Sequence, residues 1–169
     1  MPKKKEAKEK ITCDWRDRDH LKKACADADR IYRHRGDCRW SGVRTERYKQ
    51  LDGGWSAISR NMLIGNSGES SKFHLRYFEI APEGFSSLEM HRHEHVVICI
   101  RGKGRVRIGD RAHTIKHLDT VYLAPNTIHQ LYNPYNEPFG FFCIVDAKRD
   151  KPKLVETRKQ KKGSSEIQQ

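Results

Sequence analysis

The chain has 169 residues, a formal net charge of +12 at pH 7 and five cysteines. Its length suits one domain with additions, and no apolar run in it approaches the roughly 20 residues of a membrane-spanning helix. The odd number of cysteines, without paired spacing, argues against a disulfide framework, and the basic start does not lead into the apolar stretch of a secretory signal. We therefore expect a cytoplasmic protein with reduced thiols and no membrane contact.

The two ends of the chain carry most of the positive charge. Residues 1–10 hold five Lys and two Glu, net +3, and residues 148–162 hold eight Lys or Arg and two acids, net +6. Ordering such hydrated side chains costs entropy with little burial in return, so we expect a disordered basic tail at 1–12 and a basic C-terminal tail at 148–169. Contact with nucleic acid is expected to be at most weak and non-specific, because no recognition helix or zinc-finger spacing accompanies the charge.

Residues 13–42 are expected to form an N-terminal helical extension. Between residues 16 and 34 apolar side chains recur at helical spacing, with Arg, Lys and Asp on the other face; they are Leu21, Ala24, Cys25, Ala28, Ile31 and Tyr32. This pattern predicts a short amphipathic helix, for which Gly36 is a plausible stop.

From residue 43 onward the pattern changes to short β-type segments separated by turn signals. Asp52-Gly53-Gly54 is typical of a hairpin connection between two strands, and Ala81-Pro82-Glu83-Gly84 of a turn that ends a strand. We predict strands over residues 43–50, 55–64, 73–80, 95–100, 105–108, 111–115, 120–123, 128–132 and 139–145. Many short strands without intervening helices indicate an all-β sandwich or barrel, which we place at residues 43–147.

A cluster of histidines precedes one of these strands. His91, His93 and His95 alternate in Glu89-Met90-His91-Arg92-His93-Glu94-His95. Because alternate side chains of an extended chain share a face, Glu89 and the three histidines can project the same way. Clustered imidazole and carboxylate groups suit a first-row transition metal. The alternative is a solvated polar strand end, but three histidines of one parity that lead directly into an apolar run favour a metal site.

A second segment carries Pro125, His129 and Asn133. Together the two segments resemble the motifs of the cupin superfamily. The first motif has a His pair, a Glu and a Gly; the second has Gly-Asp, a Pro, a His and, four residues later, an Asn. Leu118-Asp119 stands where Gly-Asp is usual, and Pro125 lies within one residue of its place. The resemblance covers about residues 70–147.

The ligand set that the resemblance implies depends on how the first motif is aligned. With Gly102 as the anchor, the Glu position falls on His95 and the two His positions fall on Glu89 and His91, so every position keeps a metal-binding residue. With His91 and His93 as the pair, the Glu position falls on Val97 and a ligand is lost. We therefore predict as metal ligands Glu89, His91, His95 and His129, with His93 as the alternative ligand.

The resemblance implies a cupin-type double-stranded β-helix, a jelly-roll barrel, with the short N-terminal helix added and with one divalent ion of Fe, Mn, Ni, Co or Zn. It implies an enzyme acting on a small polar molecule, of the dioxygenase, decarboxylase, isomerase or lyase type. The alternative is a non-catalytic metal- or metabolite-binding module with a sensing or regulatory role. We also expect a homodimer, because an uncovered sheet edge favours pairing with a second subunit.

The remaining polar and sulfur-containing residues have simpler interpretations. Cys99 and Cys143 lie in apolar strands and are expected to be small core residues. Four arginines alternate on two strands, where solvated strand faces are expected and binding of an anionic substrate is the alternative; they are Arg76, Arg101, Arg105 and Arg107.

Overall fold

The protein was examined as a computed structural model, which describes residues 29–48 and 54–155. The described residues form eleven strands and no helix. The strands are β1 Thr45–Arg47, β2 Ser56–Ile64, β3 Phe73–Phe85, β4 Glu89–Met90, β5 His95–Arg101, β6 Lys103–Ile108, β7 Arg111–Lys116, β8 Thr120–Leu123, β9 His129–Tyr132, β10 Phe139–Asp146 and β11 Lys153–Leu154. The prediction of an all-β fold is confirmed, and each of the nine predicted segments contains a strand, although β1 is shorter and β3 longer than predicted.

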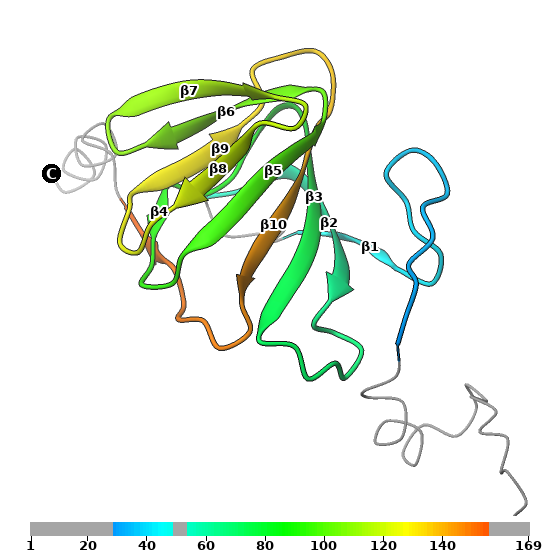
Figure 1. Cartoon of the computed structure of the whole chain (residues 1–169). Helices are drawn as coiled ribbons and strands as arrows, with labels where there is room; N and C mark the ends of the chain where they lie inside the picture. The colour runs from blue at the N-terminus through cyan, green and yellow to red at the C-terminus, as the bar shows by residue number, and fades with distance from the viewer. Residues whose placement is uncertain (1–28, 49–53, 156–169) are drawn as a thin grey trace, which may run out of the picture.

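The strands pair throughout in antiparallel fashion and build a rolled sheet with two halves (Figure 1). One half runs β1-β2-β3-β10-β5-β8, and the other runs β7-β6-β9-β4-β11. The two halves join where Phe85, at the end of β3, pairs with Tyr132 of β9. This arrangement is the jelly-roll barrel, and it places strands β4, β5 and β9, which carry the predicted ligands, around one interior.

Strand β3 continues through the four residues Ala81 to Gly84, so the prediction of a turn that ends the strand there is wrong. Glu83 adopts a positive φ of 60°, and its N–H donates to the carbonyl of Asn133 at 2.9 Å. The irregular residue bends the strand without ending its pairing, as β-bulges do. The turn signal therefore marks the place where β3 passes from one half of the barrel to the other.

The apolar core lies between the two halves. Its buried side chains come from β2, β3, β5, β6 and β10 among others, and include Ile58, Phe78, Ile80, Val97, Val106, Leu123, Phe139 and Phe141. The rings of Phe78 and Phe141 stack with centroids 5.7 Å apart. Cys99 and Cys143 belong to the same core, as predicted. Alternation along β3 brings Arg76 to the same inner face as Phe78 and Ile80.

The N-terminal segment covers the outer face of β3 and β10. The ring of Trp40 lies 5.2 Å from that of Tyr77 and 5.8 Å from that of Phe142. Of the predicted helix, residues 16–28 lie outside the described part of the chain, and residues 29–34 are not helical, so this end of the prediction is wrong. Ile31, which was predicted to lie on the apolar face of the helix, is 77% exposed. The segment packs on the barrel through the ring of Trp40 instead.

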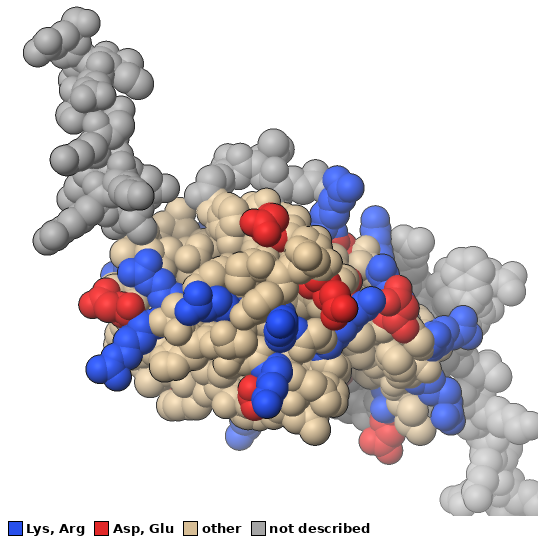
Figure 2. All heavy atoms as spheres, turned by 90° about the horizontal axis from the view of Figure 1, so that it is seen from above, with Lys and Arg blue, Asp and Glu red and all other residues tan. Residues whose placement is uncertain are grey.

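Charged side chains of both signs are interspersed on the face that Figure 2 shows, and they form no continuous basic surface there. In the described part of the chain, no helix has the length and apolarity needed to span a membrane.

Candidate metal centre

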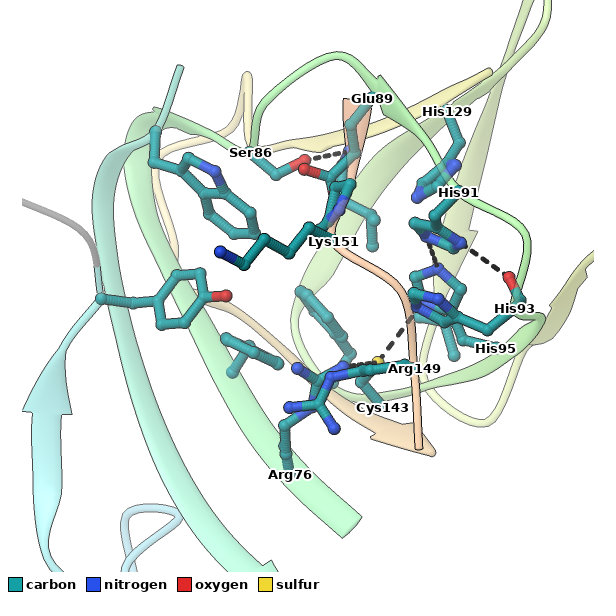
Figure 3. A pocket seen from close by; sticks show the side chains of 17 residues that line it. Arg76, Ser86, Glu89, His91, His93, His95, His129, Cys143, Arg149 and Lys151 are labelled. Atoms are coloured by element: carbon teal, nitrogen blue, oxygen red, sulfur yellow. Dashed lines mark hydrogen bonds between the residues drawn. The ribbon is translucent and has the colours of Figure 1, made fainter. Parts of the chain in front are cut away.

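Three of the predicted ligands converge inside the barrel (Figure 3). His91 follows β4, His95 begins β5 and His129 begins β9, and each offers a ligand atom within 4.8 Å of the other two. Nε2 of His91 and Nε2 of His95 lie 2.7 Å apart. All three side chains are buried, with exposures of 4%, 8% and 2%. The prediction that His91 and His95 come together with His129, which is distant from them in the sequence, is confirmed.

Hydrogen bonds on the outer nitrogens fix the orientation of two of these rings. His91 Nδ1 donates to the carbonyl of His93 at 2.6 Å, and His129 Nδ1 donates to the carbonyl of Thr127 at 2.8 Å. A carbonyl oxygen only accepts, so each Nδ1 carries the hydrogen and each Nε2 keeps its lone pair. Outer partners of this kind are typical of metal-binding histidines, because they set the tautomer and the ring angle.

The third histidine has a sulfur neighbour instead. His95 Nδ1 lies 3.5 Å from Sγ of Cys143, which also accepts a hydrogen bond from Nη2 of Arg76 at 3.2 Å. Because His91 Nε2 keeps its lone pair, His95 Nε2 donates the hydrogen across the 2.7 Å contact. If His95 Nε2 binds a cation, that hydrogen moves to Nδ1, which faces the Cys143 sulfur. Cys143 therefore lines the site as well as the core, which the sequence interpretation as a core residue did not include.

Burial keeps the three imidazoles neutral. Desolvation, reinforced by the neighbouring histidines, lowers the pKa of His91 to about 4 and that of His95 to about 2. Desolvation also lowers the pKa of His129. A neutral imidazole is the form that binds metal, so at neutral pH no proton has to be displaced from these rings before a cation binds.

Glu89 lies next to this group on the neighbouring strand. It pairs with His129 in the β4–β9 ladder, is 7% exposed and accepts a hydrogen bond from Oγ of Ser87. Directly paired residues of neighbouring strands project to the same side, so the carboxylate and the His129 ring share a face. Glu89 is not one of the three residues whose ligand atoms lie within 4.8 Å of one another, and its assignment as fourth ligand stays a prediction.

His93, the alternative ligand, has a different partner. Its ring stacks on that of His91 at 3.7 Å, and its Nδ1 lies 2.8 Å from the carboxylate of Asp150. The same carboxylate accepts hydrogen bonds from the backbone N–H groups of Arg92 and His93. These hydrogen bonds lower the pKa of Asp150. His93 is likewise outside the convergent group of three.

The convergent donors suit a transition metal ion. Three neutral, buried imidazoles whose ligand atoms lie within 4.8 Å of one another, with a buried carboxylate beside them, match the ligand types of divalent Fe, Mn, Co, Ni and Zn. If Glu89 also binds, the protein would supply four ligands, and an ion that takes six would have positions left for a substrate or water.

A cavity of about 390 Å³ opens beside the histidines. This size suits a small molecule. Aromatic side chains of Tyr48, Trp55, Phe78 and Phe141 line part of its wall. Three cationic side chains line another part, and they are Arg76, Arg149 and Lys151.

Sequence reasoning missed the contribution of the segment after β10. Residues 147–155, called the strap below, lie over the cavity mouth, although the sequence analysis places residues 148–169 in a basic C-terminal tail. The strap is fixed by Asp150 and by the pairing of β11 with β4, in which Lys153 faces Met90 and Leu154 faces Glu89. The only local sign of this role is Asp150, the one acid among the basic residues of the strap. The sequence around Asp150 does not show that its partner is His93, more than fifty residues away.

Arg76 is buried, whereas the sequence analysis expects it on a solvated strand face. Arg101 forms ion pairs with Glu79 and Asp37 at the surface, and Arg107 with Asp110, as solvated strand arginines do. Arg76 in contrast is 7% exposed and faces the cavity. The difference follows from position along the strands: Arg76 shares the inner face of β3 with Phe78 and Ile80, whereas Arg101 is the last residue of β5.

Comparison with known proteins agrees with this geometry. Residues 76–145 match the family model described as a cupin domain. Over 117 residues the chain is 36% identical to the 1-methylthio-D-xylulose 5-phosphate methylsulfurylase of Rhodospirillum rubrum, covering 69% of this chain and 74% of that protein. A solved cupin-2 domain from Rhodospirillum rubrum superposes with a TM-score of 0.67 at 32% identity, covering 80% of this chain and 90% of the other.

A cupin 2 conserved barrel protein from Rhodopseudomonas palustris superposes with a TM-score of 0.71 at 28% identity, covering 82% of this chain and 98% of the other. The match to the family model spans the strands that hold Arg76, the three convergent histidines and Cys143. By its sequence motifs, its barrel and these relatives, the chain belongs to the cupin superfamily, in the conserved-barrel group.

Proposed function

We propose that the protein is a mononuclear-metal enzyme that acts on a small polar molecule, with His91, His95, His129 and Glu89 as the metal ligands. The observation that carries this proposal is the convergence of three neutral, buried imidazoles on the wall of a cavity of ligand size. A structural metal site needs no cavity beside it, whereas a site for chemistry must admit a substrate.

The bound ion would act as a Lewis acid on a substrate oxygen such as a carbonyl or hydroxyl. The surrounding residues contribute orientation and a dry setting. The carbonyls of His93 and Thr127 hold two ligand rings in place, and Ser87 orients the Glu89 carboxylate. The aromatic side of the cavity gives an apolar part of a substrate a surface to pack on, and the strap covers the mouth.

The relative from Rhodospirillum rubrum suggests which substrates to test first. Its name gives 1-methylthio-D-xylulose 5-phosphate, a phosphorylated sugar with a methylthio group, as the compound on which it acts. We propose that this chain acts on a phosphorylated sugar of that kind. The combination of aromatic and cationic side chains in one cavity supports this substrate class, because such a molecule has both an apolar thioether end and an anionic end.

The test begins with elemental analysis of the purified full-length protein, followed by chelation and reconstitution with single metals. The reconstituted protein is then incubated with a panel of sugar phosphates that includes 1-methylthio-D-xylulose 5-phosphate, with and without a low-molecular-weight thiol as an acceptor for a released methylthio group. We expect about one ion per chain and turnover that chelation abolishes.

His113→Ala serves as the matched control, because His113 is an exposed histidine on β7 outside the cavity. Loss of metal in His91→Ala but not in His113→Ala supports the site. Full occupancy and tight substrate binding without turnover of any compound would favour the non-catalytic module instead. Absence of metal after reconstitution would overturn the proposal.

A further inference from the structure

One end of the cavity carries a buried guanidinium without an acidic partner. Arg76 is 7% exposed; its Nη2 donates to Cys143 Sγ at 3.2 Å, and its guanidinium lies 5.1 Å from the centre of the Phe78 ring. Its Nε is buried and has no hydrogen-bond partner within the described residues. A thiol sulfur is a weak acceptor. The side chain thus retains hydrogen-bonding capacity at the cavity wall.

A second guanidinium stands beside the first. Arg149, from the strap, donates through Nη1 to His74 Nδ1 at 2.8 Å and to the carbonyl of Asp146 at 3.2 Å. Both acceptors are neutral. Burial, and after it the charge of Arg76, lowers the pKa of Arg149, which reflects two cations held near each other.

No carboxylate compensates this charge. Across residues 29–48 and 54–155, Arg76, Arg149 and Lys151 take part in no ion pair. Glu89 lines the same cavity, but Figure 3 shows it beside His129, at the end away from Arg76 and Arg149. Buried charges in proteins are normally paired, because an unpaired one loses its hydration without compensation. An anion in this part of the cavity would supply the missing partner.

Two of the three cationic side chains, Arg149 and Lys151, come from the strap and line the cavity. Asp150 points away from the cavity and binds the loop at Arg92 and His93. Its neighbours Arg149 and Lys151 are among the residues that line the cavity, whereas Asp150 is not. Lys151 is exposed at the mouth.

We infer that Arg76 and Arg149, with Lys151 at the mouth, form a subsite for the phosphate group of a phosphate monoester, while the rest of the molecule extends toward the three convergent histidines. The planar forks of two guanidinium groups match several phosphate oxygens at once, and three cations suit a dianion better than a monoanionic carboxylate. The inference rests on the proposed function for the orientation of the substrate, and it adds the residues that would hold its anionic end.

The experiment titrates full-length, metal-loaded protein with inorganic phosphate by calorimetry, and with acetate as the carboxylate arm. We expect phosphate to bind more tightly than acetate. Arg149→Gln should weaken phosphate binding by roughly tenfold or more, the effect of losing a charge-assisted hydrogen bond. Arg76→Gln should do the same. Arg101→Gln is the matched control, since Arg101 lies outside the cavity and should leave the affinity unchanged.

Arg76 is buried, and Arg76→Gln alone can fail to fold. Arg149→Gln and Asp150→Asn keep the inference testable, because both leave the core untouched, and Asp150→Asn weakens the anchor of the strap. Equal phosphate affinity in the wild type and in a folded Arg149→Gln variant overturns the inference. Phosphate binding that chelation abolishes and that Arg149→Gln leaves unchanged also overturns it, since the ion would then be the phosphate site.

These outcomes separate the two proposals. Arginine-dependent phosphate binding in protein that takes up no metal on reconstitution would support the subsite and contradict the metal enzyme. Metal-dependent turnover of a phosphorylated sugar with a KM that Arg149→Gln leaves unchanged would support the enzyme and contradict the subsite.

Discussion

The carboxylate of Asp150 lies 2.8 Å from Nδ1 of His93 and accepts hydrogen bonds from two backbone N–H groups of the same loop. This contact ties the strap to the segment that carries His91, and it gives His93 a role other than metal binding. Asp150 therefore holds the strap against the loop whose His93 carbonyl orients the proposed metal ligand His91.

The identity of the fourth ligand follows from this contact as a prediction. Glu89→Ala should lower the metal affinity more than His93→Ala does, because the first change removes a proposed ligand and the second removes an anchor of the strap. Loss of an outer partner typically costs about 10–100-fold in metal affinity, so we expect His93→Ala to stay within that range and Glu89→Ala to exceed it. Metal retention during dialysis against graded chelator measures both. A larger loss in His93→Ala would show that His93 is the ligand.

The stability of the metal-free protein should depend on pH through the buried histidines. Unfolded imidazoles take up protons near the ordinary pKa of 6.5, whereas burial lowers the pKa of His91 to about 4 and that of His95 to about 2. Between pH 6.5 and about 4 the unfolded chain therefore binds more protons, and the free energy of unfolding falls as the pH is lowered through this window.

Urea unfolding of chelator-treated protein across this window measures the slope. His95→Gln should make the dependence shallower, because it removes one of the groups that titrate differently in the folded and unfolded states. A wild-type free energy of unfolding that is constant from pH 6.5 to about 4 contradicts the prediction.

The backbone conformation at Gly102 explains why a glycine stands at this position of the first cupin motif. Gly102 adopts a φ of 61°, and a Cβ there would overlap the carbonyl oxygen of Pro138. Gly109 has a similar φ of 57° but open space around it. Gly109→Ala should cost about 1–2 kcal/mol from the left-handed backbone alone, and Gly102→Ala should cost more. Urea unfolding compares the two variants. Equal losses in the free energy of unfolding would contradict the prediction, because they would mean that the backbone near Pro138 shifts to admit the Cβ at no energetic cost.

The strap divides the C-terminal region into two parts that respond differently to truncation. Deleting residues 1–10 and 156–169 should leave folding and metal content intact, because these residues hold no proposed ligand. Deleting residues 148–169 should lower the free energy of unfolding, because it also removes Asp150 and the pairing of β11 with β4. Thermal unfolding and elemental analysis test both truncations. Metal loss after deletion of residues 1–10 and 156–169 contradicts the assignment of the ligands to the barrel.

The basic ends give a related prediction about nucleic acid. Full-length protein should bind DNA or RNA only weakly, with an affinity that falls steeply as salt rises, and the protein without residues 1–10 and 156–169 should bind less. Filter binding across a salt series measures this. Sequence-selective binding at physiological salt that truncation abolishes would show a nucleic-acid function.

We also predict a homodimer. Strand β1 pairs on one side with β2 and has no second neighbour among the described strands, which leaves an edge open to another chain. Light scattering at micromolar concentration should give twice the mass of one chain. A monomeric mass there contradicts the prediction.

The strands and the histidine cluster were predictable from the sequence because their signals are local. Short β-type segments separated by turn signals predicted nine strands, and the same-parity histidines that lead into β5 predicted a face of metal ligands. The resemblance to cupin motifs joined His129 to this face, and the structure brings the three histidines together. The predicted helix is wrong at residues 29–34, because helical spacing of small apolar residues says nothing about whether a surface exists for them to cover.

The enclosure of the site was decided by tertiary structure alone. Arg76 lies on the inner face of β3 and is buried at the cavity wall, whereas Arg101 ends β5 and pairs with acidic side chains at the surface. Arg149, Asp150 and Lys151 belong by composition to a solvated basic segment, and they line or hold the cavity because Asp150 finds donors on a loop distant in sequence. Local patterns record the periodicity of each strand, whereas the partner of a charged side chain depends on which distant segments the fold brings together.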